Sequence, residues 1–136
     1  IDEFQLFMSK YPNSDLVDSC NVNIKDLRSR LELKSFEKAK LYFKMEKYRS
    51  AIISLNTTLT QFPDSKFRED IYFMILKANF LFAFNSVEAK KVERFEETIK
   101  SYHNFVDYFS ESSNLKTAET YFTTSVKEIE KLKTLN

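Results

Sequence analysis

Apolar residues recur along nearly the whole chain at steps of three and four, the spacing that places them on one face of an α-helix. From this pattern we predict one long helix, or two abutting ones, over residues 14–45, followed by helices over 47–61, 65–84, 95–109 and 114–133. Residues 86–94 are polar and charged, and they form either a loop or the first turns of the helix that runs to Phe109. Asp26 and Arg30 stand four residues apart on the polar side of the first helix, where an ion pair adds ~0.2–0.5 kcal/mol.

Two similar phrases separate these helices, SKYPNSDLVD at residues 9–18 and QFPDSKFRED at 61–70, and they contain both prolines of the chain, Pro12 and Pro63. Proline lacks an N–H and disfavours helical geometry in the residue before it, so each phrase should end the incoming helix. A third copy, residues 109–116, has Ser110 in place of proline, which predicts a softer stop.

The residues after each proline predict how the next helix begins. Asn13 or Ser14, and Asp64 or Ser65, can accept hydrogen bonds from the free N–H groups of a first helical turn, each cap contributing about 1 kcal/mol. The Ser and Asn residues of the third copy can do the same. The chain therefore has a regular alternation of helix, turn and cap.

The three phrases repeat at a spacing typical of stacked helical repeats. Tyr11, Phe62 and Phe109 lie 51 and 47 residues apart. We predict an all-α fold of stacked helical hairpins, an α-solenoid, forming one array over residues 1–136. Its parts are the end of a preceding repeat (2–12), a repeat (14–62), a repeat with an insertion at about 85–93 (64–109), and a terminal capping helix (112–134).

The residues within each unit resemble a tetratricopeptide repeat, which places small and large apolar residues in a fixed order before a proline. Glu46 departs from that pattern, because the turn between the two helices of a repeat favours glycine. The residues that match it, and that we expect to be structural, are Ala39, Tyr42, Tyr48, Ala51, Leu55 and Pro63, with Pro12 before them and Ala78 and Phe82 after them.

One branch of this superfamily fits more closely. The YPNS phrase, the segment KDLRSRL at 25–31, the residues Ala39, Tyr42 and Phe43, and the second FPDS phrase resemble the C-terminal half of BamD-type outer-membrane β-barrel assembly lipoproteins. The 85–93 insertion and the Lys- and Asn-rich character resemble versions from Bacteroidota. The resemblance implies a lipid-bearing cysteine in an N-terminal portion outside this chain. Cys20 is not that residue, because Val17, Asp18 and Ser19 do not form the apolar lead of a lipobox.

Composition narrows the function classes. The chain has no glycine, so phosphate-cradling loops of the Walker or dinucleotide type cannot be built. Its formal net charge is only +1, which disfavours nucleic acid as a partner. The single cysteine cannot form a disulfide within the chain. The most apolar run, residues 71–84, includes Lys77 and Asn79 and predicts a central buried helix, not a membrane span.

We expect no catalytic residues, no cofactor and no metal site, because His103 and Cys20 lack the partners and spacing that such chemistry requires. His103 is expected on the surface and Cys20 as a small buried apolar residue. Interrepeat aromatic residues are candidate interface anchors: Tyr11, Phe62, Phe67, Tyr108 and Phe109. The candidate partner-binding residues are those in and beside the charged turns, which otherwise only face solvent: Lys47, Arg49, Lys66, Phe67, Arg68 and Glu69.

The resemblance implies a lipid-anchored scaffold on the periplasmic face of the outer membrane. Its partners would be the periplasmic domains of the barrel-forming subunit and other assembly subunits, with membrane contact only through the anchor. A generic repeat adaptor that binds a short peptide is the alternative. A third possibility, an accessory of cell-wall enzymes, requires a site outside this chain.

Overall fold

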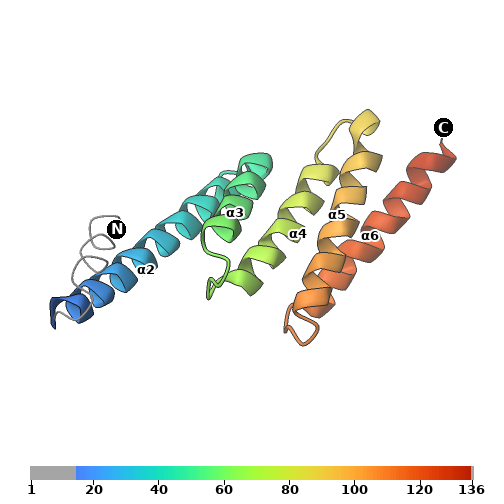
Figure 1. The fold of residues 1–136 in the computed structure, drawn as a ribbon. Helices are drawn as coiled ribbons and strands as arrows, with labels where there is room; N and C mark the ends of the chain where they lie inside the picture. Colours follow the sequence, from blue (N-terminus) through green and yellow to red (C-terminus); the bar gives the residue numbers. More distant parts are fainter. Residues whose placement is uncertain (1–14, 136) are drawn as a thin grey trace. The chain divides into compact units, whose positions relative to one another are not determined.

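The structure, a computed structural model, describes residues 15–135. The described residues form helices and no strand, which confirms the all-α class (Figure 1). The helices are α2 (Asp15–Lys44), α3 (Tyr48–Gln61), α4 (Arg68–Phe84), α5 (Glu88–Tyr108) and α6 (Leu115–Thr134). The expectations for residues 2–12, Pro12, Asn13 and Ser14 lie outside the described residues.

The predicted helix boundaries agree with the observed ones to within three residues, except at the start of α5. The polar segment 86–94 is predicted to be either a loop or the first turns of a helix. Residues 88–94 are the first turns of α5, so the second alternative is confirmed. Only residues 85–87 connect α4 to α5. The part of the predicted insertion that follows residue 87 therefore lengthens a helix.

The chain divides into two compact units, residues 1–35 and 36–136, with the division inside α2. In the described part of the first unit, Asp26 and Arg30 form the predicted ion pair, with 3.0 Å between carboxylate and guanidinium. The apolar face predicted for this helix is only partly covered there: Ile24 is half-buried, whereas Leu27 and Leu31 are exposed.

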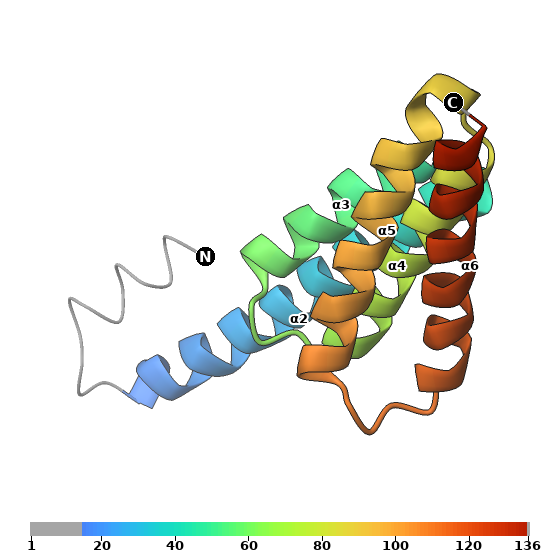
Figure 2. The same cartoon turned by 90° about the vertical axis from the view of Figure 1, so that its right-hand side faces the viewer.

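The second unit consists of antiparallel helices packed side by side, as Figures 1 and 2 show for α4, α5 and α6. Helix α4 packs against α3, α5 and α6, so it is in contact with helices on both sides. This arrangement gives two hairpins, the end of α2 with α3 and α4 with α5, followed by α6. The tetratricopeptide-like packing predicted from the sequence is therefore present.

Three apolar clusters hold this unit together, and α4 contributes to all of them. Alanines with no exposed surface, Ala39, Ala51 and Ala78, lie among the helices. Tyr42 and Tyr48 are half-buried. The clusters consist of Phe36, Ala39, Leu55, Ile71 and Ile75; of Leu76, Phe105 and Ala118; and of Ala83, Phe95 and Ile129.

The turns after α3 and α5 have the same hydrogen bonds, displaced by 47 residues. The Phe62 N–H donates to the Thr58 carbonyl and the Ser65 N–H to the Phe62 carbonyl; in the later turn Phe109 N–H donates to Phe105 and Ser112 N–H to Phe109. The Ser65 hydroxyl accepts from the Phe67 N–H at 3.1 Å, as the Ser112 hydroxyl does from Asn114.

This geometry corrects two predictions. Neither Asp64 nor Ser65 caps α4, because the N-cap position is Phe67 and no side chain caps it. Ser65 instead stabilises the turn before the helix, because its hydroxyl accepts a hydrogen bond from the Phe67 N–H. The Ser and Asn residues of the third phrase do not cap α6 either, because its N-cap position is Asn114 and no side chain caps it. The turn at Ser110 keeps the same backbone hydrogen bonds as the turn with Pro63, and its softer stop stays a prediction.

The turn between α2 and α3 places Glu46 at a φ of 62°, in the left-handed region. The Lys47 N–H donates to the Tyr42 carbonyl and the Glu46 N–H to the Phe43 carbonyl, the bond pair of a Schellman helix end. Glycine usually occupies this position because a Cβ costs roughly 1–2 kcal/mol there. The departure from the repeat pattern at Glu46 is thus a site of backbone strain.

Helices α4 and α6 occupy equivalent places in the 47-residue repeat but differ on one side. Leu76 and Phe80 of α4 pack in the clusters that α5 shares. The residues of α6 that correspond to them, Thr123 and Lys127, are exposed and polar or charged. The side of α6 that corresponds to the α5-facing side of α4 is therefore exposed to solvent.

Candidate partner-binding surfaces

The aromatic member of the predicted partner set, Phe67, is half-buried and packs against the apolar cluster of Phe36, Leu55 and Ile71. Its ring stacks on Phe36 of α2, with the ring centroids 4.5 Å apart and an interplanar angle of 19°. Phe67 stands immediately before α4, where the hydrogen bond to Ser65 fixes its backbone. The stacked face of the ring is thus occupied within the chain, and Phe67 ties the α3–α4 turn to α2.

Arg68 is also engaged within the chain. Its guanidinium donates to the Pro63 carbonyl at 2.8 Å and lies over the rings of Tyr72 and Tyr108, 5.4 Å from each centroid. Cation–π contacts of this kind stabilise by ~0.5–1 kcal/mol at exposed sites. Arg68 therefore links the α3–α4 turn to the end of α5, while Tyr108 itself stays 61% exposed.

The other charged candidates form two groups. Lys66 is exposed, with its ammonium 5.3 Å from the centroid of the Phe67 ring, and Glu69 is half-buried in the first turn of α4. Lys47 and Arg49 are exposed at the start of α3. Because α3 has 14 residues, the two groups lie about 20 Å apart along the helix. The structure does not bring the six predicted residues into one site.

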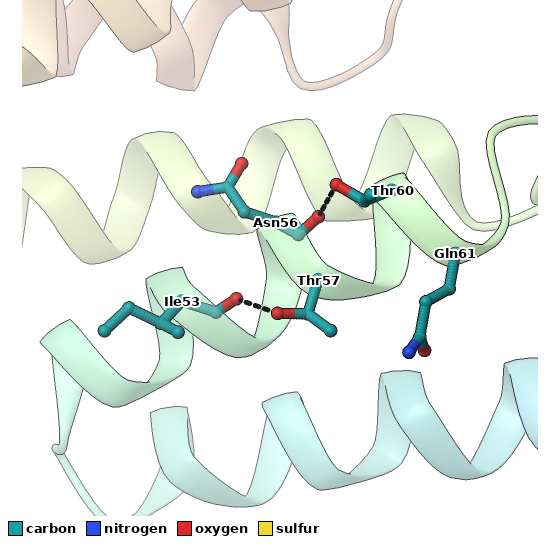
Figure 3. Close-up of a pocket in the computed structure, with 5 residues that line it drawn as sticks. All are labelled: Ile53, Asn56, Thr57, Thr60 and Gln61. Carbon is teal, nitrogen blue, oxygen red and sulfur yellow. Dashed lines mark hydrogen bonds between the residues drawn. The ribbon is translucent and has the colours of Figure 1, made fainter.

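Sequence reasoning missed a surface that lies between these groups, the uncharged face of α3. We define it as Ile53, Asn56, Thr57, Thr60 and Gln61, which line an open hollow of about 420 Å³ (Figure 3). From Ser50 to Gln61 the helix has no charged residue, although 30% of the chain is charged. That run of uncharged residues was the available signal, since interface centres are depleted in charge.

The threonines of this face have their hydroxyls turned back onto the helix. The Thr57 hydroxyl donates to the Ile53 carbonyl at 2.9 Å, and the Thr60 hydroxyl donates to the Asn56 carbonyl at 3.0 Å (Figure 3). Their donors are already satisfied, so covering these side chains with a partner costs less desolvation. Ile53, which is 60% exposed, lies beside them on the same face.

Aromatic residues at the α5–α6 boundary form a second group. Tyr102 stacks on Phe122 with 4.6 Å between centroids, and the exposed His103 lies edge-on to Phe122 at 5.6 Å. Burial, and then the Glu119 carboxylate, raise the pKa of Tyr102, and burial raises the pKa of Tyr121. Both shifts favour the neutral phenol, which suits a packing role.

The described residues show no grouping of His, Cys, Asp and Glu that could hold a metal ion. Cys20 is a free, half-buried thiol on α2. Within residues 15–135 no helix is both long and apolar enough to cross a membrane. The candidate sites among these residues are the exposed surfaces of the helices and turns described above.

The sequence model of the YfiO family, described as an outer membrane lipoprotein, matches residues 1–95, a range that includes α2, α3, α4 and the first turns of α5. No curated protein matches the chain.

Proposed function

Since the chain belongs to the YfiO family of outer membrane lipoproteins, we propose that it is a scaffold subunit of the outer-membrane β-barrel assembly machinery. On this proposal it works on the periplasmic face of the outer membrane and binds the periplasmic domains of the barrel-forming subunit. The family match, which extends over more than half of the chain, is the observation that carries the proposal.

The packing of the second unit supports a scaffold role. A subunit that positions another protein must keep its own surface fixed, and stacked hairpins do so through the interfaces between neighbours. Here α4 is held on both sides, and Phe67 and Arg68 fasten the α3–α4 turn to α2 and α5. Arg68 and Phe67 then act by shaping this turn, and the exposed Lys66 and the half-buried Glu69 remain the candidates for contact there.

We place the main protein contact on the uncharged face of α3. Its centre has Ile53 and threonines with satisfied hydroxyls, and charged residues stand at its ends, with Arg49 before it and Asp64 and Lys66 after it. The centre of a protein interface is usually depleted in charged residues, which lie at its rim. The partner surface should likewise be uncharged where it meets Ile53.

Two matched substitutions test this placement. Thr57 and Thr120 are both exposed helix residues whose hydroxyls donate to the carbonyl four residues earlier. Thr57→Asp puts a charge at the centre of the uncharged face, and Thr120→Asp puts one on α6. The intact protein should co-purify with the barrel-forming subunit; Thr57→Asp should reduce recovery at least about tenfold, and Thr120→Asp should not.

Failure to co-purify with any outer-membrane barrel protein would overturn the scaffold role. Equal effects of the two substitutions would leave that role intact and remove the α3 placement. The alternative function is a peptide-binding adaptor, in which the peptide would bind in the same open hollow beside α3. It predicts that a short linear segment binds with micromolar affinity and that no large folded partner is retained, which peptide titration distinguishes.

A further inference from the structure

Charge is distributed unevenly between the two ends of the second unit. The helix ends and turns at residues 44–49, 85–94 and 130–135 have eight basic residues against four acidic ones, a formal charge of +4. We call these segments the basic end. The opposite turns, residues 61–70 and 107–116, have three basic against five acidic residues, a formal charge of −2. The whole chain is nearly neutral, so the asymmetry is local.

The fold brings the three segments of the basic end to one side. Ala83 near the end of α4, Val92 near the start of α5 and Leu132 near the end of α6 belong to one apolar cluster. The Lys77 ammonium lies 5.5 Å from the Phe43 ring centroid, which places the last turn of α2 beside the second half of α4. In Figure 1 these segments all lie at the upper end of the helices.

Exposed apolar side chains are concentrated at the same end. Met45 in the α2–α3 turn is 51% exposed, Val87 in the α4–α5 turn is 69% exposed, and Leu135 after α6 is 72% exposed. Phe84, at the end of α4, is 48% exposed and has the Lys91 ammonium 5.8 Å from its ring centroid. Each apolar side chain therefore stands at a tip, with lysines or arginine nearby.

From this combination we infer that the basic end contacts an anionic phospholipid surface, with Met45, Val87 and Leu135 entering the headgroup layer. Basic residues near a membrane are attracted by anionic headgroups, and apolar side chains at the tips of turns can enter the boundary between headgroups and acyl chains. The apolar residues stand at separate tips and form no continuous face, which favours a soft lipid surface over one protein groove. The inference does not depend on which protein the uncharged face of α3 binds.

Vesicle flotation with the intact chain tests this inference. The protein should float with vesicles of phosphatidylglycerol and phosphatidylcholine, and not with vesicles of phosphatidylcholine alone. Binding should weaken at high salt, because ions screen exposed charges. The double variant Lys90→Glu/Lys133→Glu should lower the apparent affinity at least about tenfold. The control Lys66→Glu/Lys116→Glu changes the net charge equally at the opposite end and should bind as the parent does.

A second variant separates the apolar contribution from folding. Val87 is the N-cap residue of α5, a position where serine is preferred, so Val87→Ser should keep or raise the melting temperature. It should nevertheless weaken vesicle binding severalfold. Equal loss in the two lysine double variants would overturn the inference. So would a lack of binding to any vesicle, which would make the basic end a site for an acidic protein surface instead.

Discussion

The hydroxyl of Ser65 accepts a hydrogen bond from the backbone N–H of Phe67, and only 4% of Ser65 is exposed. Water has little access to replace the hydroxyl there, so Ser65→Ala should leave the Phe67 N–H without an acceptor. We expect a loss of about 1–3 kcal/mol in the free energy of unfolding, measured by chemical denaturation.

The same substitution at Ser112 should cost less, because Ser112 is half-buried and water can reach the Asn114 N–H. Ser113→Ala, at an exposed neighbour, is the control and should change stability little. If Ser65→Ala costs no more than Ser113→Ala, the hydroxyl does not stabilise the turn.

Replacing Glu46 by glycine should stabilise the protein. At a φ of 62° the Glu46 Cβ crowds the backbone, and glycine removes that strain. We expect the free energy of unfolding to rise by about 1 kcal/mol in thermal or chemical denaturation. Glu46→Ala keeps the Cβ and should give no such gain, so an equal rise in both variants would point to the lost charge instead.

Removing the hydroxyl of Ser125 should also stabilise the protein. The Ser125 oxygen is buried without a hydrogen-bond partner among the described residues, a state that costs free energy. The corresponding residue of α4 is Ala78, fully buried, which indicates that alanine suits this position. Ser125→Ala should add about 1 kcal/mol to the free energy of unfolding.

Ser101 provides the matched contrast. Its hydroxyl accepts from the Asn79 amide at 2.7 Å and donates to the Glu97 carbonyl at 3.0 Å, so it is satisfied. Ser101→Ala should therefore destabilise by about 1–3 kcal/mol, the opposite sign to Ser125→Ala. A loss of stability in both variants would show that the Ser125 hydroxyl has a partner.

Alkaline pH should destabilise the fold through two tyrosines. The pKa values of Tyr102 and Tyr121 are raised above the ordinary 10.0, so the folded state holds the phenol protons to higher pH than the unfolded chain does. Above about pH 10 the unfolded chain therefore binds fewer protons, and stability must fall as pH rises. Replacing both by phenylalanine should flatten this fall in denaturation curves, and an unchanged slope would contradict the assignment.

The helices could be predicted from sequence because their apolar spacing and the scarce turn residues agree. The end of α3 illustrates this, since Leu55, Leu59 and Pro63 define both its face and its limit. The start of α4 was harder to predict from the sequence. Ser65 has the chemistry of a cap, but it stands two residues before the N-cap position Phe67. Only backbone geometry decides that its hydroxyl meets the Phe67 N–H.

The candidate surfaces could be predicted less well, because charge alone does not reveal what a side chain contacts. From the sequence, Arg68 is expected to be a cation that faces solvent. In the fold it lies against the rings of Tyr72 and Tyr108, and Tyr108 is 40 residues away along the sequence. The uncharged face of α3 had the opposite difficulty. Its run of serine, threonine and asparagine has no strong motif, and it becomes informative only when the fold leaves it exposed beside charged neighbours.

The position of α4 has a consequence for how the second unit unfolds. Its side chains belong to all three apolar clusters, so neither the hairpin before it nor α6 after it can detach without exposing part of α4. Opening at either edge is thereby coupled to the same helix, and the unit should melt as one cooperative body instead of repeat by repeat. Amide hydrogens near the middle of α4 should then exchange with solvent only through global unfolding, later than those of α6.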